Sequence, residues 1–312
     1  MAKKNHKTAC VIIPTLLAQP ELLRKCLLSL DKLTNKDYFE VMIVGNVADA
    51  DLRSYIKQLP SFHYRFRSIA LGKNKGFPAA LNAGIKHTRA QYLLPLNDDT
   101  EVDSLWLDEL VKTQQSSGAD MVASTIFLSD RQTIDSQGFT FLWRGRAIPL
   151  KNTSSSLQFL ADYWLKHPHL LHQNGSSHWQ EPFGCDAAGC LYTRQLFEKV
   201  GLFRENFFAY LEDVDLTLRA RKVGMYCALA PNAFVYHHKH MTSKNMGNLK
   251  IRKDVQNWYR IIIHNYQLPV LTRFGWLIIL ERSRNISGYL KRGKSNSKNT
   301  NYLPSTAIAK DE

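Results

Sequence analysis

Tyr92-Leu93-Leu94-Pro95-Leu96-Asn97-Asp98-Asp99-Thr100 is the stretch that decides the fold class of this 312-residue chain. An apolar run of strand length ends there in two adjacent carboxylates, Asp98 and Asp99. Ligands of α/β sheets bind at the C-terminal ends of strands, and two neighbouring carboxylates ionise together only when a positive partner lies beside them. A divalent cation that also contacts a diphosphate would be such a partner. The alternative is a polar turn that caps a helix, because Asn, Asp and Thr favour turns.

Apolar segments of strand length and helical segments alternate on both sides of this stretch. Strands are predicted at 10–14, Phe39–Val44, Tyr64–Ala70, Met121–Leu128 and Thr140–Trp143, and helices at Glu21–Leu33, 79–87 and Ser104–Gln115. This rhythm is typical of a mostly parallel sheet with crossover helices. We therefore predict an α/β fold of the nucleotide-binding kind, with helices on both faces of the sheet.

Composition bounds the class of protein. The chain is 44% hydrophobic, enough for one large α/β domain or two small ones. Its longest apolar windows are too short to span a bilayer, and we expect no secretory signal. The five cysteines lack zinc-site spacing, which favours reduced thiols in a cytoplasmic protein. Residues 151–180 show no periodicity, and a loop that covers a binding site and a variable surface loop are both open interpretations.

The net charge of +14 favours anionic partners. No zinc finger, helix-turn-helix or RNA-binding aromatic signature is present, so we do not expect nucleic acid as a partner. One concentration of basic residues lies near the C-terminus and consists of Arg282, Arg284, Lys291, Arg292, Lys294 and Lys298. Two interpretations of this cluster are equally open, a solvated tail and attraction to an anionic membrane surface.

A second acidic cluster follows the aromatic stretch 207–210. Glu212, Asp213 and Asp215 lie within four residues, and Asp215 has the spacing of an i,i+4 ion pair with Arg219. Carboxylates at an exposed helix start would explain part of this pattern. Beside aromatic side chains, however, a carboxylate can have a raised pKa and act as a general base.

Three histidines end another predicted strand, in the segment 233–240. A single histidine there would be structural, whereas His237, His238 and His240 together favour binding of a metal ion or a phosphate group. Exposure to solvent is the alternative for His238 and His240.

In this order, the motifs resemble the inverting glycosyltransferases of family 2 with the GT-A fold, particularly the rhamnosyltransferase-like branch. The resemblance covers roughly residues 8–245. Its elements are Val11–Thr15 as the opening strand, Asn74-Lys75-Gly76 with Ala80, Asn82 and Gly84, the Asn97-Asp98-Asp99 metal motif, the Asp135–Gly138 turn, Gly189 with Arg194, Glu212-Asp213, and Val235-x-His237.

The resemblance implies a role for each matched residue. Donor-binding residues would be Pro14, Thr15, Asn46, Asn74, Gly76, Asn82 and Asp98, and metal ligands for Mg²⁺ or Mn²⁺ would be Asp99 and His237. Asp213 would be the catalytic base, with Gly189 and Glu212 on the acceptor side. Lys73 or Lys75 would either assist the diphosphate or remain solvated.

The implied reaction moves a sugar, rhamnose or another hexose, from a nucleotide-diphosphate donor to a glycan or lipid-linked saccharide in surface polysaccharide synthesis. We expect a catalytic domain over 1–265, a helical extension with a basic tail over 266–312, and a cytoplasmic protein that is peripheral on the inner face of the membrane.

Two departures from the family pattern bear on the donor. The second strand ends in Val44-Gly45-Asn46, where the family usually has an acid that binds the nucleotide base, so Asn46 or Asp49 would have to substitute. Leu16-Leu17 also replaces the usual Tyr-Asn after the opening strand. The absent acid is the best argument for an alternative function, an inactive GT-A domain that binds sugar or serves as a scaffold. A sugar-nucleotide transferase is less favoured, because no glycine-rich loop follows the first strand.

Overall fold

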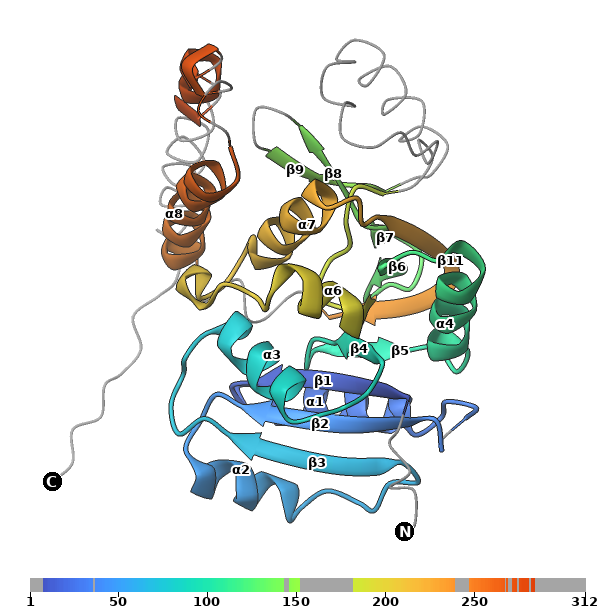
Figure 1. Cartoon of the computed structure of the whole chain (residues 1–312). Coiled ribbons are helices and arrows are strands. Elements are labelled where there is room, and N and C mark those ends of the chain that lie inside the picture. The colour runs from blue at the N-terminus through green and yellow to red at the C-terminus, as the bar shows by residue number, and fades with distance from the viewer. Residues whose placement is uncertain are drawn as a thin grey trace, which may run out of the picture. The chain divides into compact units, whose positions relative to one another are not determined.

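The computed structural model describes residues 8–35, 37–142, 146–151, 182–238, 247–266, 268, 271–273, 275–280 and 282–283. The chain divides into two compact units, Met1–Asn265 and Tyr266–Glu312. The first unit contains the central sheet (Figure 1). None of the described helices combines the length and the apolar composition that crossing a membrane requires.

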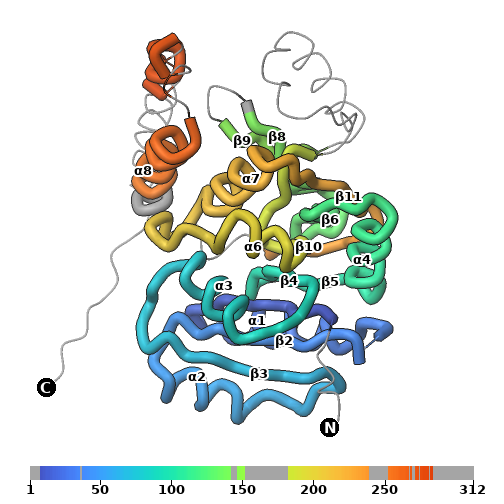
Figure 2. The backbone as a smooth tube through the Cα atoms, in the orientation of Figure 1, coloured from blue at the N-terminus to red at the C-terminus, as the bar shows by residue number. Residues whose placement is uncertain are grey.

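A mixed sheet, nine-stranded over the described residues, forms the centre of the first unit. Its order is β3 (Arg65–Ala70), β2 (Phe39–Gly45), β1 (Ala9–Thr15), β4 (Tyr92–Pro95), β10 (Cys190–Thr193), β6 (Met121–Leu128), β11 (Cys227–His237) and β5 (Thr100–Val102), with β7 (Ile134–Ser136) paired to β6. The first four strands are parallel, as are β6 and β11. β10 is antiparallel to both of its neighbours and lies between β4 and β6 although it is distant from them in sequence (Figure 2).

Helices cover both faces of the sheet because alternate residues of the buried strands point to opposite sides. On β1, Val11 and Ile13 pack with α1 (Pro20–Leu30), α2 (Asp49–Ile56) and α4 (Trp106–Ser117). Cys10 and Ile12 pack on the other face with α3 (Phe77–Lys86), α6 (Arg194–Val200) and α7 (Glu212–Lys222). The remaining elements are the hairpin β8 (Phe139–Leu142) and β9 (Arg146–Pro149), the 3₁₀ helix η2 (Glu205–Phe207) and α8 (Gly247–Asn265).

Strand β11 departs from a regular ladder in a way that matters for the site. Ala230 pairs with Ser124 of β6, and the next paired residues are Phe234 and Thr125. β11 therefore advances by four residues where β6 advances by one. Beyond this irregularity, His237 is paired with Thr100 of β5. The histidine therefore lies beside the turn that follows β4.

The predicted strands and helices are present, and the structure adds short elements that the sequence did not indicate. The predicted polar turn between Met121–Leu128 and Thr140–Trp143 contains the three-residue strand β7, which is too short to show periodicity. The carboxylate pair is followed directly by β5 before α4 begins. Trp143 and the loop segment 152–180 lie outside the described residues.

Candidate active site

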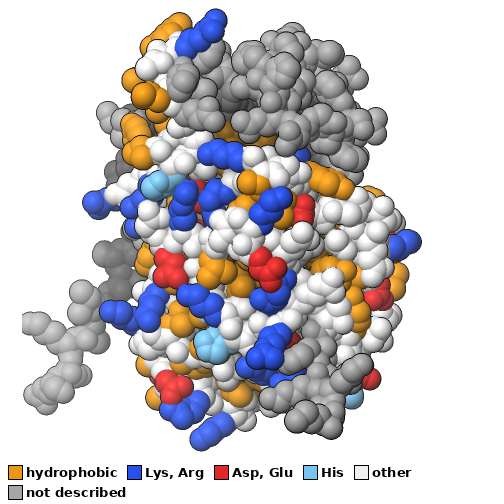
Figure 3. Space-filling model, in the orientation of Figure 1, with side chains coloured by type: hydrophobic (Ala, Val, Ile, Leu, Met, Phe, Trp, Pro, Cys, Tyr) orange, Lys and Arg blue, Asp and Glu red, His pale blue; other side chains and the backbone are white. Residues whose placement is uncertain are grey.

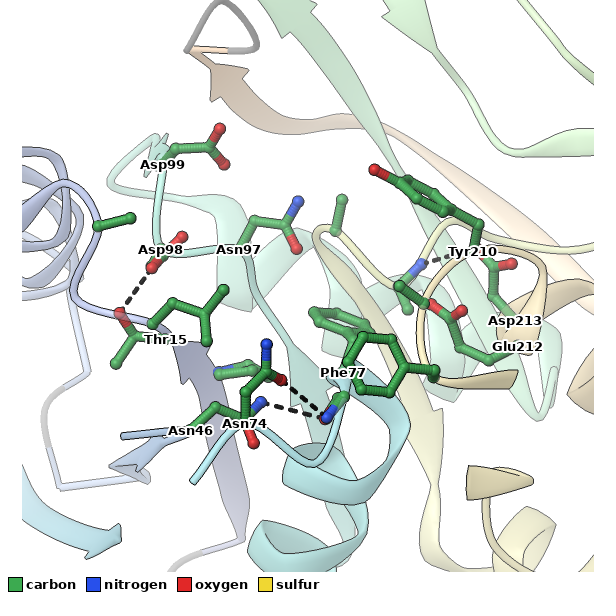
Figure 4. Close-up of a pocket in the computed structure, with 18 of the residues that line it drawn as sticks. Thr15, Asn46, Asn74, Phe77, Asn97, Asp98, Asp99, Tyr210, Glu212 and Asp213 are labelled. Atoms are coloured by element: carbon green, nitrogen blue, oxygen red, sulfur yellow. Dashed lines mark hydrogen bonds between the residues drawn. The ribbon is translucent and has the colours of Figure 1, made fainter. Parts of the chain in front are cut away.

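A pocket of about 430 Å³ opens at the C-terminal ends of β1 and β4, and the labelled side chains in Figure 4 surround it. Most of the predicted site residues line it, namely Pro14, Thr15, Asn46, Asn74, Gly76, Asp98, Asp99, Glu212, Asp213 and His237. Segments from both halves of the sequence thus meet in one cavity. Asn82 and Gly189 are not part of its lining.

Asp98 lies at one end of the pocket and is fixed by Thr15. The Thr15 hydroxyl donates to Oδ2 of Asp98 at 2.6 Å and accepts a hydrogen bond from the Leu17 N–H at 2.9 Å. Burial raises the pKa of Asp98 to about 6, against the lowering effect of the Thr15 hydrogen bond and with a further increase from the charge of Asp99. A cationic or hydrogen-bond-donating ligand would favour the ionised form of this carboxyl group.

Asp99 and His237 are in contact at the same end of the pocket. The Asp99 Oδ1 atom lies 3.1 Å from Nε2 of His237, and the other ring nitrogen faces Oδ2 of Asp135 at 3.9 Å. The amide of Asn97 is 3.4 Å from the same Nε2, where it can donate to an unprotonated nitrogen. Carboxylates behind a histidine orient its ring for metal binding.

These two side chains would suit a divalent cation, since a carboxylate oxygen and an imidazole nitrogen lie side by side. No group of three or more His, Cys, Asp or Glu side chains suited to a metal ion occurs among the described residues. The protein would therefore supply Asp99 and His237, and a ligand or water would supply the remaining oxygens. The imidazole nitrogen favours Mn²⁺ over Mg²⁺, since Mg²⁺ is bound mainly by oxygen atoms.

The loop before α3 forms the floor of the pocket. Both ends of the Asn46 amide are used within this loop, since Nδ2 donates to the Gly76 carbonyl and Oδ1 accepts from the Lys75 N–H, each at 3.1 Å. Asn74 Oδ1 accepts from the Gly76 N–H at 3.0 Å. Gly76 has φ +92°, and a Cβ atom there would lie 2.4 Å from the Phe208 carbonyl oxygen. These residues shape the loop that a donor would contact.

Three other predicted residues stabilise neighbouring elements. Asn82 exchanges hydrogen bonds with the backbone of Phe203, at 2.9 and 3.1 Å. Gly189 packs under Val235, whose Cγ2 would lie 3.0 Å from an added Cβ. Arg194 donates to two carbonyls in the segment that follows α3, that of Ala90 at 2.7 Å and that of Thr88 at 3.0 Å. None of these contacts is made to the pocket.

Glu212 and Asp213 form the other end of the pocket, at the start of α7 (Figure 4). Burial raises the pKa of Glu212 to about 7. Burial also raises the pKa of Asp213 well above its ordinary value, and the charges of Glu212 and Asp186 add to this. Asp213 Oδ1 accepts from the Val214 N–H at 2.8 Å and Oδ2 from the Ala187 N–H at 3.4 Å. A carboxylate that is fixed by hydrogen bonds, lines a pocket and has a raised pKa is suited to accept a proton.

Asp215 has a different role from its two acidic neighbours. It is fully buried and pairs with Arg219 at 3.0 Å, which confirms the predicted i,i+4 ion pair, and with Arg204 at 2.5 Å. Asn265 of α8 also donates to Asp215 at 2.9 Å. Asp215 therefore links α7 to the segment before η2 and to α8.

Asp186 is a pocket residue that sequence reasoning missed. The Ser136 hydroxyl donates to it, and Ser136 also bonds the backbone of Gly138, so the 135–138 turn supports the acidic end of the pocket. The available signal was a single acid in an otherwise apolar stretch between Gly184 and Gly189. Tyr210, also missed, lines the pocket beside Glu212 (Figure 4).

Comparison with known proteins agrees with this arrangement. The family model described as "Glycosyl transferase family 2" matches residues 10–200, more than half of the chain. The chain therefore belongs to glycosyl transferase family 2.

Curated relatives share sequence with parts of the chain. It is 25% identical over 239 residues to "Uncharacterized protein y4gI" of Sinorhizobium fredii, which covers 73% of this chain and 24% of that protein. It is 41% identical over 68 residues to an "N-acetylglucosaminyl-diphospho-decaprenol L-rhamnosyltransferase" of Mycobacterium tuberculosis, covering 21% of this chain and 22% of that enzyme. The chain thus spans about a quarter or less of the length of these relatives.

Solved structures show the same fold. GalNAc-T7, crystallised with UDP, GalNAc and Mn²⁺, superimposes with a TM-score of 0.59 at 14% identity, over 83% of this chain and 48% of that one. The mixed sheet with helices on both faces is the GT-A fold expected from the sequence.

Proposed function

We propose that this chain is an inverting glycosyltransferase that moves a sugar from a nucleoside-diphosphate donor to an acceptor hydroxyl. The observation that carries the proposal is one pocket with the Asp99–His237 pair and Asp98 at one end and the raised-pKa pair Glu212–Asp213 at the other. A single displacement needs one group that stabilises the leaving diphosphate and one base, and the two ends of the pocket provide them.

At the donor end, Thr15 holds Asp98 by a hydrogen bond, and Asp98 would contact the nucleoside of the donor. Asp99 and His237 would hold a divalent cation there. When bound, a Mn²⁺ or Mg²⁺ ion supplies Lewis-acid stabilisation of the departing diphosphate. The loop shaped by Asn46, Asn74 and Gly76 gives the donor a rigid floor.

At the acceptor end, Asp213 takes the proton from the attacking hydroxyl as the oxygen approaches the anomeric carbon from the face opposite the diphosphate. The base has to lie across the sugar from the leaving group, and the presence of a second acid cluster in the same pocket as Asp99 and His237 supports this assignment. Burial keeps the pKa of Asp213 high, and the charges of Glu212 and Asp186 add to this, because both effects disfavour its ionised form.

The sugar in the proposal is rhamnose or another hexose, and the acceptor is a glycan or lipid-linked saccharide in surface polysaccharide synthesis. The support is the 41% identical segment shared with a rhamnosyltransferase named for a diphospho-decaprenol acceptor. A net charge of +14 also suits a diphosphate-linked acceptor. Lys and Arg side chains are scattered over the face drawn in Figure 3 and are not gathered in one patch.

We also propose that residues 1–265 are the catalytic domain and that 266–312 are an extension that attaches a cytoplasmic enzyme to the inner membrane surface. Leu268, Trp276 and Ile279 are exposed in the second unit, each with more than 60% of its surface accessible, at 72%, 65% and 67%. Apolar side chains of this kind followed by basic residues are typical of segments that bind anionic lipid surfaces.

The test is a panel of UDP-, GDP- and dTDP-sugars, scored for thermal stabilisation and hydrolysis with Mn²⁺ present and absent. We expect one donor to stabilise the protein in the presence of Mn²⁺ and to be slowly hydrolysed. Stabilisation by free saccharides with no response to any nucleotide sugar would favour the alternative, a sugar-binding domain without catalysis.

A further inference from the structure

The segment 207–211, of which Phe208, Ala209 and Tyr210 line the pocket, forms a wall between the α3 loop and the acid pair, and its backbone is strained. Phe208 has φ 64° and ψ −51°. The Ala209 N–H donates to the Phe207 carbonyl at 2.7 Å, so Phe208 is the central residue of a γ-turn, in the form with positive φ. Tyr210 and Leu211 have φ of 70° and 66°. Side chains other than glycine stay in such conformations only when surrounding contacts hold them.

One side of this segment is held by α3. The Phe77 N–H, the first of the helix, donates to the Phe208 carbonyl at 2.7 Å. Gly76 lies directly against the same carbonyl, with no room for a side chain. The wall is therefore in contact with the donor loop.

The other side is held by one amide from α8. Asn257 is fully buried, and its Nδ2 atom lies 2.9 Å from the carbonyl oxygen of Phe207, 2.6 Å from that of Ala209 and 2.7 Å from that of Tyr210. Arg260, one turn further along the helix, donates to Oδ1 of Asn257 at 2.6 Å. Because Oδ1 accepts this hydrogen bond, the donor end of the amide faces the three carbonyls.

We propose that Asn257 is a positioning residue that holds the 207–211 wall in the strained conformation required for Asp213 to work as the base. This inference rests on the proposed function. Leu211, the last residue of the wall, is the N-cap of α7 and adjoins the acid pair, so a shift of the wall moves the start of this helix. Asn257 lies beyond the region matched by the family model, residues 10–200, so the match assigns it no role.

The experiment compares Asn257→Ala and Asn257→Asp with the matched control Asn265→Ala. Asn257→Asp keeps the shape of the side chain but turns a carboxylate toward the three carbonyls. Asn265 is a second buried asparagine of α8, and its partners are Asp215 and Lys222 of α7, outside the wall. Hydrogen exchange of the amides of residues 208–213 and steady-state transfer, with the best donor from the nucleotide-sugar panel and Mn²⁺, are measured for all variants.

Both Asn257 variants should exchange these amides faster than the control at equal global stability. They should lose about 10- to 100-fold in kcat, a larger factor than any change in KM for the donor, because Leu211 joins the wall to the acid pair while the contacts of Phe77 and Gly76 still hold its donor side. The proposal is overturned if exchange in this segment matches the control, or if kcat falls no further than in Asn265→Ala. Hydrogen exchange needs no turnover, so it decides the role of Asn257 separately even if the wild-type chain transfers no sugar from the panel.

Discussion

The Nε2 atom of His237 lies 3.1 Å from Oδ1 of Asp99, although one residue ends the eleventh strand and the other follows the fourth. The antiparallel pairing of His237 with Thr100 brings them together. His238, the next residue, donates its N–H to the Asp99 carbonyl at 2.9 Å, which fixes the turn from the other side. Backbone hydrogen bonds between the two segments thus hold these two side chains next to each other, where they could share one cation.

Replacing Asp99 by asparagine should remove cation-dependent binding of a nucleoside diphosphate. The variant loses the negatively charged ligand and keeps its size, so the affinity gain from Mn²⁺ should disappear in calorimetric titrations with UDP, GDP and dTDP. Asp108→Asn, a substitution of an exposed aspartate on α4, serves as the control and should titrate like the wild type. Equal diphosphate affinity with and without Mn²⁺ in the wild type would remove the metal from the mechanism.

Asp213→Asn should bind donor normally and transfer its sugar poorly. Loss of a general base costs on the order of 10²–10⁴ in rate while leaving ground-state binding in place. Transfer rate and donor affinity are measured side by side for Asp213→Asn and Glu212→Gln. If Glu212→Gln is inactive and Asp213→Asn transfers at a near-normal rate, the base is Glu212.

The buried Glu212 should make stability depend on pH in a direction opposite to that of an ordinary paired carboxylate. Its pKa rises from 4.5 in the unfolded chain to about 7 in the folded one, so the folded state binds more protons between these values. The stabilising contribution is complete below about pH 4.5 and is lost as pH rises through 7, a change on the order of 3 kcal/mol.

Urea denaturation of the wild type and Glu212→Gln from pH 5 to pH 8 measures this effect. The variant should gain stability relative to the wild type as pH rises, because glutamine does not ionise. A difference between the two proteins that stays constant with pH would show that Glu212 titrates normally in the folded state.

Asp215→Asn should destabilise the fold by about 3–5 kcal/mol, since it leaves Arg204 and Arg219 without their buried partner. The exposed pair of Asp49 and Arg53 on α2 offers a matched comparison, and Asp49→Asn should cost less than about 1 kcal/mol. Chemical denaturation gives both values. Similar losses in the two variants would mean that the buried pair contributes no more than a surface one.

Truncation after Ile279 tests the membrane proposal. The shortened chain lacks the whole basic C-terminal cluster and should sediment at least about tenfold less with vesicles that contain phosphatidylglycerol. Vesicles of phosphatidylcholine alone are the control, and neither chain should bind them strongly. Unchanged binding to the anionic vesicles would mean that the tail is solvated and takes no part in membrane binding.

The sequence predicted the parts of the site that end strands, and it missed the parts that depend on distant packing. Asp98, Asp99 and His237 follow apolar runs, so a strand-end position could be inferred for each. The antiparallel insertion of β10 between β4 and β6 leaves no local pattern, because register between distant segments is set by the assembled sheet.

Burial explains the other residues whose environment could not be predicted from the sequence. Glu212 was open to interpretation as part of an exposed helix start, and only the packed structure shows that 6% of its surface is accessible. Asn82 and Arg194 match family motifs, yet their partners belong to neighbouring segments, the backbone of Phe203 and the Glu205 carboxylate for Asn82 and backbone carbonyls for Arg194. Asn257 stands in an ordinary amphipathic helix, and nothing in its sequence context indicates that three carbonyls converge on it.

The irregular pairing of β11 separates the position of His237 from the length of the strand before it. Residues 231–233 lie between two paired positions, Ala230 and Phe234, whose partners are adjacent on β6. Extra residues of this kind interrupt the ladder locally, so a residue gained or lost among them can be absorbed there. The orientation of the imidazole depends instead on the regular pairing that follows, where His237 lies opposite Thr100.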